Sequence, residues 1–222
     1  YDNLYRLSGR TYKYSTGYTN TVGYVYKDRG TSYTTGQVSQ YSTKINNNTA
    51  TTYTYTYDAN GNITQIVDNS GKVTKYYYDD VGQLIREDNP YYNNSVKYTY
   101  DNNGNRTAKT TYVYTSGELT GDLYRSLQYY GYDDTEWGDR MTSFLGVPIT
   151  YDEVGNPLHY NNVCELTWKN GRELATAVVG SKNLSFTYNA DGIRTSKTVD
   201  EVKHTYTLNG SQIVSEQWDD KL

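Results

Sequence analysis

The chain has 222 residues, of which 29 are tyrosine and only 2 are phenylalanine, so a ring that carries a hydroxyl group supplies most of the apolar surface. The net charge is −4 and no run of Lys or Arg occurs, which excludes the basic surface that nucleic acid or an anionic membrane requires. A single cysteine, Cys164, excludes an internal disulfide and a Cys-based zinc site, and no apolar stretch reaches transmembrane length.

Alternating side chains predict antiparallel strands along the chain. Tyr53, Tyr55 and Tyr57 alternate with threonines, and the same period of two recurs at 96–100, 184–188 and 202–208. A period of two with aromatic and β-branched residues is typical of half-buried strands, and apolar residues do not recur at helical spacing. The sequence therefore predicts an all-β chain of antiparallel hairpins.

Glycine pairs predict the turns between these strands. Asn-Gly or Asp-Gly stands at 60–61, 103–104, 170–171, 191–192 and 209–210, and such pairs tolerate the positive φ of tight hairpins. The Asp that follows the strand's last Tyr is expected to accept hydrogen bonds from backbone amides across the turn. A second, looser turn is expected in the middle of the repeat, at 69–71.

A seven-residue signature, Tyr-Asp-x-x-Gly-x-Leu/Ile/Arg, returns roughly every 20 residues. It is complete at 57–63, 78–84 and 100–106, and weaker copies start at Tyr151, Tyr188 and Tyr206. Two degenerate copies fill the longer gaps: Tyr132-Asp133 reaches its glycine, Gly138, two residues late, and Trp168 replaces the Tyr and reaches Gly171 one residue early. Such self-similarity indicates a repeat array whose units stack. The predicted structural signature consists of Tyr57, Asp58, Gly61, Tyr78, Asp79, Gly82, Tyr100, Asp101, Gly104, Tyr151, Asp152, Gly155, Trp168, Gly171, Tyr188, Gly192, Tyr206 and Gly210.

One continuous array is expected over residues 1–222, with irregular insertions near 15–26, 90–95 and 115–122. None of these stretches has the composition of an interdomain linker. Because the chain opens within a copy of the signature at Tyr1-Asp2, we interpret it as a fragment of a longer polypeptide.

The Tyr-Asp repeats resemble the YD repeats of Rhs proteins, bacterial wall-associated proteins, insecticidal toxin complexes and animal teneurins. The stretch 188–197 is especially similar to the repeats that precede the Rhs-associated core. The resemblance implies a curved sheet within a hollow β-shell, which encloses a C-terminal effector in the toxin members and belongs to an adhesion receptor in teneurins. The family's self-cleavage motif contains Asp-Pro, and this dipeptide is absent from the chain, so self-cleavage and toxicity do not transfer to these residues.

Few residues suggest catalysis. His159 and Cys164 are five residues apart and would suit a nucleophile and its base, but they flank the expected turn at 161–162, and nothing nearby supplies an oxyanion site. A structural role is the favoured interpretation. His204 shares a predicted strand face with Val202 and Tyr206 and is expected to be a packed ring.

Metal and sugar sites receive weak support. The runs 58–62 and 101–105 imitate the start of a calcium loop, but Gly61 is fourth instead of sixth and Asn69 stands where Glu is required, which favours turn chemistry and leaves weak calcium binding open. No cofactor or metal site is predicted. Among Trp137, Trp168 and Trp218, which have rings able to stack on sugars, Trp168 takes the repeat's Tyr position, which favours packing.

The sequence thus favours a non-enzymatic scaffold. The leading hypothesis is a structural segment of a YD-repeat shell that encapsulates or displays a C-terminal effector in a large secreted or cell-wall-associated bacterial protein. Its partners would be neighbouring repeats and that effector, without nucleic acid or membrane insertion. The alternative is a carbohydrate-binding or adhesion module that uses exposed Tyr and Trp rings on cell-wall or surface glycans.

Overall fold

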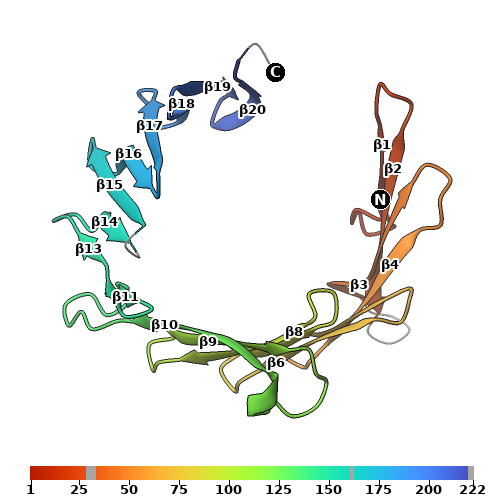
Figure 1. The fold of residues 1–222 in the computed structure, drawn as a ribbon. Coiled ribbons are helices and arrows are strands. Elements are labelled where there is room, and N and C mark those ends of the chain that lie inside the picture. The colour runs from red at the N-terminus through yellow and green to blue at the C-terminus, as the bar shows by residue number, and fades with distance from the viewer. Residues whose placement is uncertain (29–33, 161–162, 220–222) are drawn as a thin grey trace. The chain divides into compact units, whose positions relative to one another are not determined.

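The computed structural model describes residues 1–28, 34–160 and 163–219, and almost all regular structure in them is antiparallel β-sheet (Figure 1). The predicted all-β class is confirmed. The turn expected at 161–162 lies outside the described residues. The chain forms two compact units, residues 1–127 and 128–222, which are described separately.

In the N-terminal unit each strand pairs antiparallel with the next along the chain. This order is what consecutive hairpins produce, because each tight turn returns the chain beside the strand it has just left. The strands are β1 (Gly9–Lys13), β2 (Thr19–Asp28), β3 (Thr34–Ile45), β4 (Thr51–Tyr57), β5 (Ile63–Asp68), β6 (Val73–Tyr78), β7 (Leu84–Asn89), β8 (Asn94–Tyr100) and β9 (Arg106–Val113).

The C-terminal unit continues the same plan. The N-terminal unit ends with a short 3-10 helix, η1 (Gly121–Leu123), and the first residues of β10 (Tyr124–Gly131), a strand that runs across the boundary between the units. Strand β10 pairs with β11, and β11 pairs with β12, while β13 to β20 pair in chain order. These strands are β11 (Ser143–Phe144), β12 (Val147–Pro148), β13 (Thr150–Tyr151), β14 (Pro157–Tyr160), β15 (Cys164–Lys169), β16 (Glu173–Val179), β17 (Lys182–Tyr188), β18 (Arg194–Val199), β19 (Val202–Asn209) and β20 (Gln212–Gln217).

The core is thin, and half-buried tyrosines make up much of it. Among the described residues, the buried hydrophobic side chains are Val22, Val96, Ile149, Ala177 and Phe186. Tyrosines at directly opposed positions continue the packing across strands, because side chains two residues apart share one face of a strand. The alternation of Tyr and Thr in β4 follows this rule, with Thr54 and Thr56 exposed and Tyr55 and Tyr57 half-buried.

Part of the expected insertion at 15–26 is strand instead of loop. A short turn at residues 15–17 is followed by β2, which pairs with both β1 and β3. Gly23, a residue typical of loops, is a strand residue here: a Cβ at this position would lie 2.7 Å from Ser42 Oγ in the neighbouring strand. The glycine therefore permits a close approach of strands. The end of the insertion expected at 90–95 is also strand, since β8 begins at Asn94.

The turn in the middle of the repeat is tighter than expected. Asp68 Oδ1 accepts hydrogen bonds from the backbone amides of Ser70 and Lys72, both at 2.8 Å. Gly71 has φ of 81° and donates its amide to the carbonyl of Asp68 at 3.1 Å. This turn has the same Asp and Gly arrangement as the signature but lacks the Tyr. Strand β5 therefore has an Asp turn of the same kind at each of its two ends.

Candidate functional site: the Tyr-Asp turns

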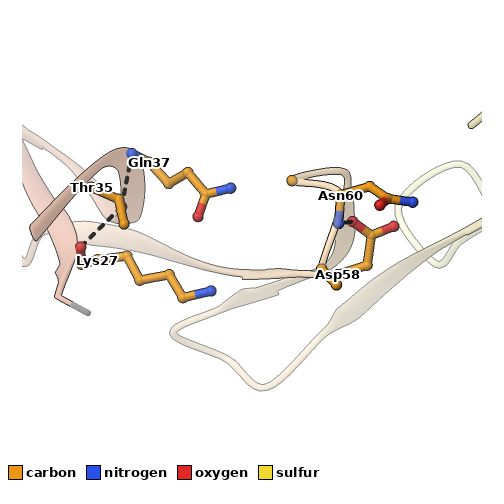
Figure 2. Close-up of a pocket in the computed structure, with 7 residues that line it drawn as sticks. Lys27, Thr35, Gln37, Asp58 and Asn60 are labelled. Carbon is orange, nitrogen blue, oxygen red and sulfur yellow. Dashed lines mark hydrogen bonds between the residues drawn. The ribbon is translucent and has the colours of Figure 1, made fainter. Parts of the chain in front are cut away.

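An aspartate carboxylate organises each complete copy of the signature. In the first of them, Asp58 Oδ1 accepts the backbone amides of Asn60 at 3.0 Å and Asn62 at 2.8 Å, and the first of these bonds is drawn in Figure 2. The same pair of bonds recurs at Asp79, Asp101 and Asp152, and Asn189 makes it with an amide oxygen. The predicted role of the Asp as acceptor of turn amides is confirmed.

Each signature glycine has positive φ, between 59° and 92°, at Gly61, Gly82, Gly104, Gly155, Gly171, Gly192 and Gly210. Two of them differ in what a side chain would meet. Open space surrounds the Cβ position of Gly82, whereas a Cβ on Gly155 would lie 2.6 Å from the Trp137 ring. Trp137 therefore packs directly on this turn.

We expect Gly82→Ala to lower the free energy of unfolding by about 1 kcal/mol, the cost of placing alanine in the left-handed region. Gly155→Ala adds a clash with Trp137 and is expected to cost roughly 2 kcal/mol more. Denaturant unfolding measures both, and combining Gly155→Ala with Trp137→Ala removes the clash. Equal costs for the two glycine variants would contradict the packing of Trp137 on the turn.

The signature aromatic bonds to the preceding repeat. Tyr78 donates its hydroxyl to the carbonyl of Ile63 at 2.9 Å, and Tyr100 donates to that of Leu84 at 2.8 Å. In both cases the acceptor is the seventh residue of the preceding copy of the signature. The indole Nε1 of Trp168 donates in the same way to the carbonyl of Pro157 at 2.7 Å. The repeat therefore requires a ring with a donor at its tip, which phenylalanine lacks.

Three further tyrosines donate a hydrogen bond of the same kind to an earlier backbone carbonyl. Tyr26, Tyr57 and Tyr151 donate to carbonyls of Leu7, Val38 and Met141 at 3.0, 2.7 and 2.6 Å. Leu7 ends a copy that begins at Tyr1, in which Asp2 accepts the amides of Leu4 and Arg6, both at 2.9 Å. Tyr5, with φ of 58°, stands where other copies have glycine. The copy noted in the sequence at Tyr1-Asp2 therefore keeps the turn without a glycine.

Basic side chains from earlier in the chain lie over the rings of Tyr26 and of several signature tyrosines. The Arg6 guanidinium lies 4.0 Å from the centre of the Tyr26 ring, and Arg140 lies 5.3 Å from that of Tyr151. Lys27, Lys169 and Arg194 take the same position over Tyr57, Tyr188 and Tyr206, each at 5.6 Å. A cation over an aromatic face is attracted by the ring quadrupole. These cation–π contacts join residues from different repeats, so a local sequence pattern does not predict them.

The weaker copies depart from the signature in informative ways. At 132–141 it is Asp134, not Asp133, that accepts turn amides, those of Glu136 and Trp137, and it pairs with Arg140. The copies starting at Trp168 and Tyr206 lack the Asp. Their turns are formed by Asn170-Gly171-Arg172 and by Gly210-Ser211 between paired strand residues.

The candidate catalytic pair does not come together. His159 is opposite Glu165 in the register of β14 and β15, and Cys164 is opposite Tyr160. Adjacent strand residues point to opposite faces, so His159 and Cys164 lie on different faces of this sheet. His204 is a packed ring: its Nδ1 lies 2.8 Å from Glu216 Oε1, and the ring stacks on Trp218 at 5.4 Å.

Shallow polar cavities separate successive turns. One of about 480 Å³ lies between Gln37 and Lys27 on one side and the turn at Asp58 on the other (Figure 2). Cavities of about 420 and 520 Å³ follow between the turns at Asp58 and Asp79 and between those at Asp79 and Asp101. The Asp58 carboxylate already holds turn amides, and the described residues contain no group of three His, Cys, Asp or Glu suited to a metal ion. These cavities reflect the spacing of repeats.

The turn carboxylates predict acid sensitivity. A hydrogen bond from the side chain of Asn62 lowers the pKa of Asp58 below 3.8, and one from Asn105 does the same for Asp101. An aspartate whose pKa is lower in the folded chain than in the unfolded chain stabilises the fold at pH values above its unfolded pKa. This stabilisation is lost as the pH falls through the pKa of the folded state. We therefore expect the unfolding midpoint to drop as the pH falls below about 4, the usual pKa of an unfolded Asp. Asp101→Asn, which copies Asn189, should make that drop smaller; an unchanged drop would contradict the assignment.

Comparison with known proteins agrees with this geometry. Residues 57–93 match the family model described as RHS Repeat. The crystal structure of TcdB2-TccC3-TEV superposes on 90% of the chain with a TM-score of 0.66 and 15% identity, and the match covers 12% of that longer chain. A structure of the Photorhabdus luminescens Tc holotoxin pore matches 94% of the chain at 15% identity, with a TM-score of 0.42 and 14% of its own chain covered. No curated protein matches.

The expected resemblance to Rhs repeats is confirmed at residues 57–93, where the family model matches. The chain carries an RHS repeat at 57–93, and its fold is the one found in the TcdB2-TccC3 complex. No helix among the described residues is both long enough and apolar enough to span a membrane.

Proposed function

We propose that the chain is a non-catalytic stretch of wall in a larger Rhs-repeat shell, which encloses or displays a C-terminal effector of the same polypeptide. The hydrogen bonds from Tyr78, Tyr100 and Trp168 to the seventh residue of the preceding copy carry this proposal. Because each such bond joins a repeat only to its neighbour, any number of repeats can be joined in this way without a central core. An extended wall of repeats needs this kind of contact.

The mechanism is steric. Hairpins paired in chain order form a barrier, and the signature Tyr, Asp and Gly residues hold each turn against its neighbour. In this proposal residues 1–222 act as one array, its partners are further repeats and the effector, and the parent protein is secreted or exposed at the cell surface. The match to only 12% of the longer TcdB2-TccC3-TEV chain supports a role as part of a larger assembly.

Limited proteolysis of the full-length parent protein tests enclosure. We expect the C-terminal segment to resist protease in the wild type and to be cut faster when Tyr78→Ala and Tyr100→Ala are combined, because both bonds between repeats are lost. Tyr92→Ala is the matched control, since Tyr92 is 74% exposed. Rapid cleavage in the wild type would contradict enclosure. Saturable glycan binding that Trp137→Ala abolishes would favour the carbohydrate-binding alternative instead.

A further inference from the structure

Three tyrosines stand in a row across neighbouring strands of the N-terminal unit. Tyr24 in β2 is directly opposite Tyr41 in β3, and Tyr41 is directly opposite Tyr53 in β4. The ring centres of Tyr24 and Tyr41 are 5.5 Å apart with planes at 49°, and those of Tyr41 and Tyr53 are 6.2 Å apart with planes at 22°. Tyr41 is therefore in ring contact with a phenol on either side.

The row is accessible and belongs to one face. All three rings are half-buried, so solvent reaches part of each. Tyr55, two residues after Tyr53 in β4, shares this face, and burial, followed by the neighbouring phenols, raises its pKa. Tyr57, by contrast, has its hydroxyl bound to the carbonyl of Val38 at 2.7 Å.

We infer that this row is a site of oxidative crosslinking, at which Tyr41 couples with Tyr24 or Tyr53 to give dityrosine. The oxidant is a haem peroxidase that consumes hydrogen peroxide. Each of the two phenols loses one electron and one proton, and the two phenoxyl radicals form a carbon–carbon bond between ring positions next to the hydroxyls. The two ring hydrogens displaced there move to the oxygens as the rings regain aromaticity. Overall, two phenols and one hydrogen peroxide give one dityrosine and two waters.

Ring contact favours this row because radical coupling succeeds when a second phenol is already beside the first. Tyr112 and Tyr124 provide a comparison in the same unit: their centres are 6.3 Å apart and their planes are almost perpendicular, at 84°. That edge-on arrangement aligns the coupling positions of the two rings less well. A bond at Tyr41 ties β3 covalently to β2 or β4, so the crosslinked hairpin resists unfolding because its unfolded chain is constrained.

The test treats the dilute 222-residue chain with hydrogen peroxide and a haem peroxidase, isolates the monomer and maps linked peptides by mass spectrometry. We expect two linked pairs, Tyr24 with Tyr41 and Tyr41 with Tyr53, each lighter by two hydrogen atoms than its separate peptides. The crosslinked monomer should also unfold at a higher denaturant concentration than the untreated chain.

Conservative variants separate this chemistry from folding. Tyr41→Phe keeps the ring and should remove both linked pairs, whereas Tyr24→Phe should remove the first and keep the second. Tyr92→Phe, in an exposed turn, should change neither. Circular dichroism verifies that each variant is folded. Linked pairs that form mainly between exposed tyrosines, or a Tyr24–Tyr53 pair that persists in Tyr41→Phe at the wild-type yield, would overturn the inference.

Discussion

Replacing Tyr100 by alanine is expected to lower the free energy of unfolding of the N-terminal unit by about 3 kcal/mol. The substitution removes a half-buried ring and the hydroxyl that donates to the carbonyl of Leu84 at 2.8 Å. Urea unfolding followed by circular dichroism measures the change.

Tyr100→Phe isolates the hydroxyl. It keeps the ring and removes the bond to Leu84, so we expect a loss of about 1 kcal/mol. Tyr92→Phe, in the exposed turn after β7, is the control and should be neutral. A phenylalanine variant as stable as the wild type would show that the bond between repeats contributes nothing and that only ring packing matters.

Replacing Asp88 by alanine is expected to cost about 3 kcal/mol, because it leaves a partly buried guanidinium without its carboxylate. Asp88 is 1% exposed, and its Oδ1 accepts a hydrogen bond from Arg86 Nε at 2.7 Å. Arg86 also donates to the carbonyls of Thr115 and Gly117, so it fastens the segment after β9 to β7. The same urea titration reports this loss.

Asp88→Asn and Ser95→Ala dissect this contact. Asparagine keeps the shape of the side chain and an acceptor oxygen, so its cost should be roughly half that of alanine. Ser95 is fully buried and exchanges two hydrogen bonds with the backbone of Thr115, at 2.9 and 3.1 Å, so its loss should free the same segment. Proteolytic cutting near 115–120 that stays at the wild-type rate in all three variants would contradict this role.

Local chemistry was predictable from the sequence. The alternation of Tyr and Thr predicted β4, and the spacing of Asp58 and Gly61 predicted a turn in which the carboxylate accepts amides. Both depend on residues within one turn or one strand, where side-chain identity determines the outcome. Asp68 was missed as a second turn of this kind because no Tyr precedes it, although Asp68-Asn69-Ser70-Gly71 carries the same spacing.

Contacts between repeats were not predictable in this way. The acceptor for each signature hydroxyl is a backbone carbonyl, which every residue has, so the sequence gives no sign of which one is used. The bonds from Arg86 to the carbonyls of Thr115 and Gly117 join residues about 30 positions apart. The insertion expected near 15–26 is partly strand for a related reason, since the neighbour that requires a glycine at Gly23, Ser42, lies in another strand.

Hydrogen exchange in Tyr100→Phe tests the bond between repeats most directly. Tyr100 belongs to one copy of the signature, and its acceptor, Leu84, ends the preceding copy. If the hydroxyl holds the two copies together, the amides of Gly82, Gln83 and Leu84 should exchange faster in the variant, while the Tyr92→Phe control stays at the wild-type rate. Faster exchange confined to residues 101–106, with the preceding turn unchanged, would contradict the account.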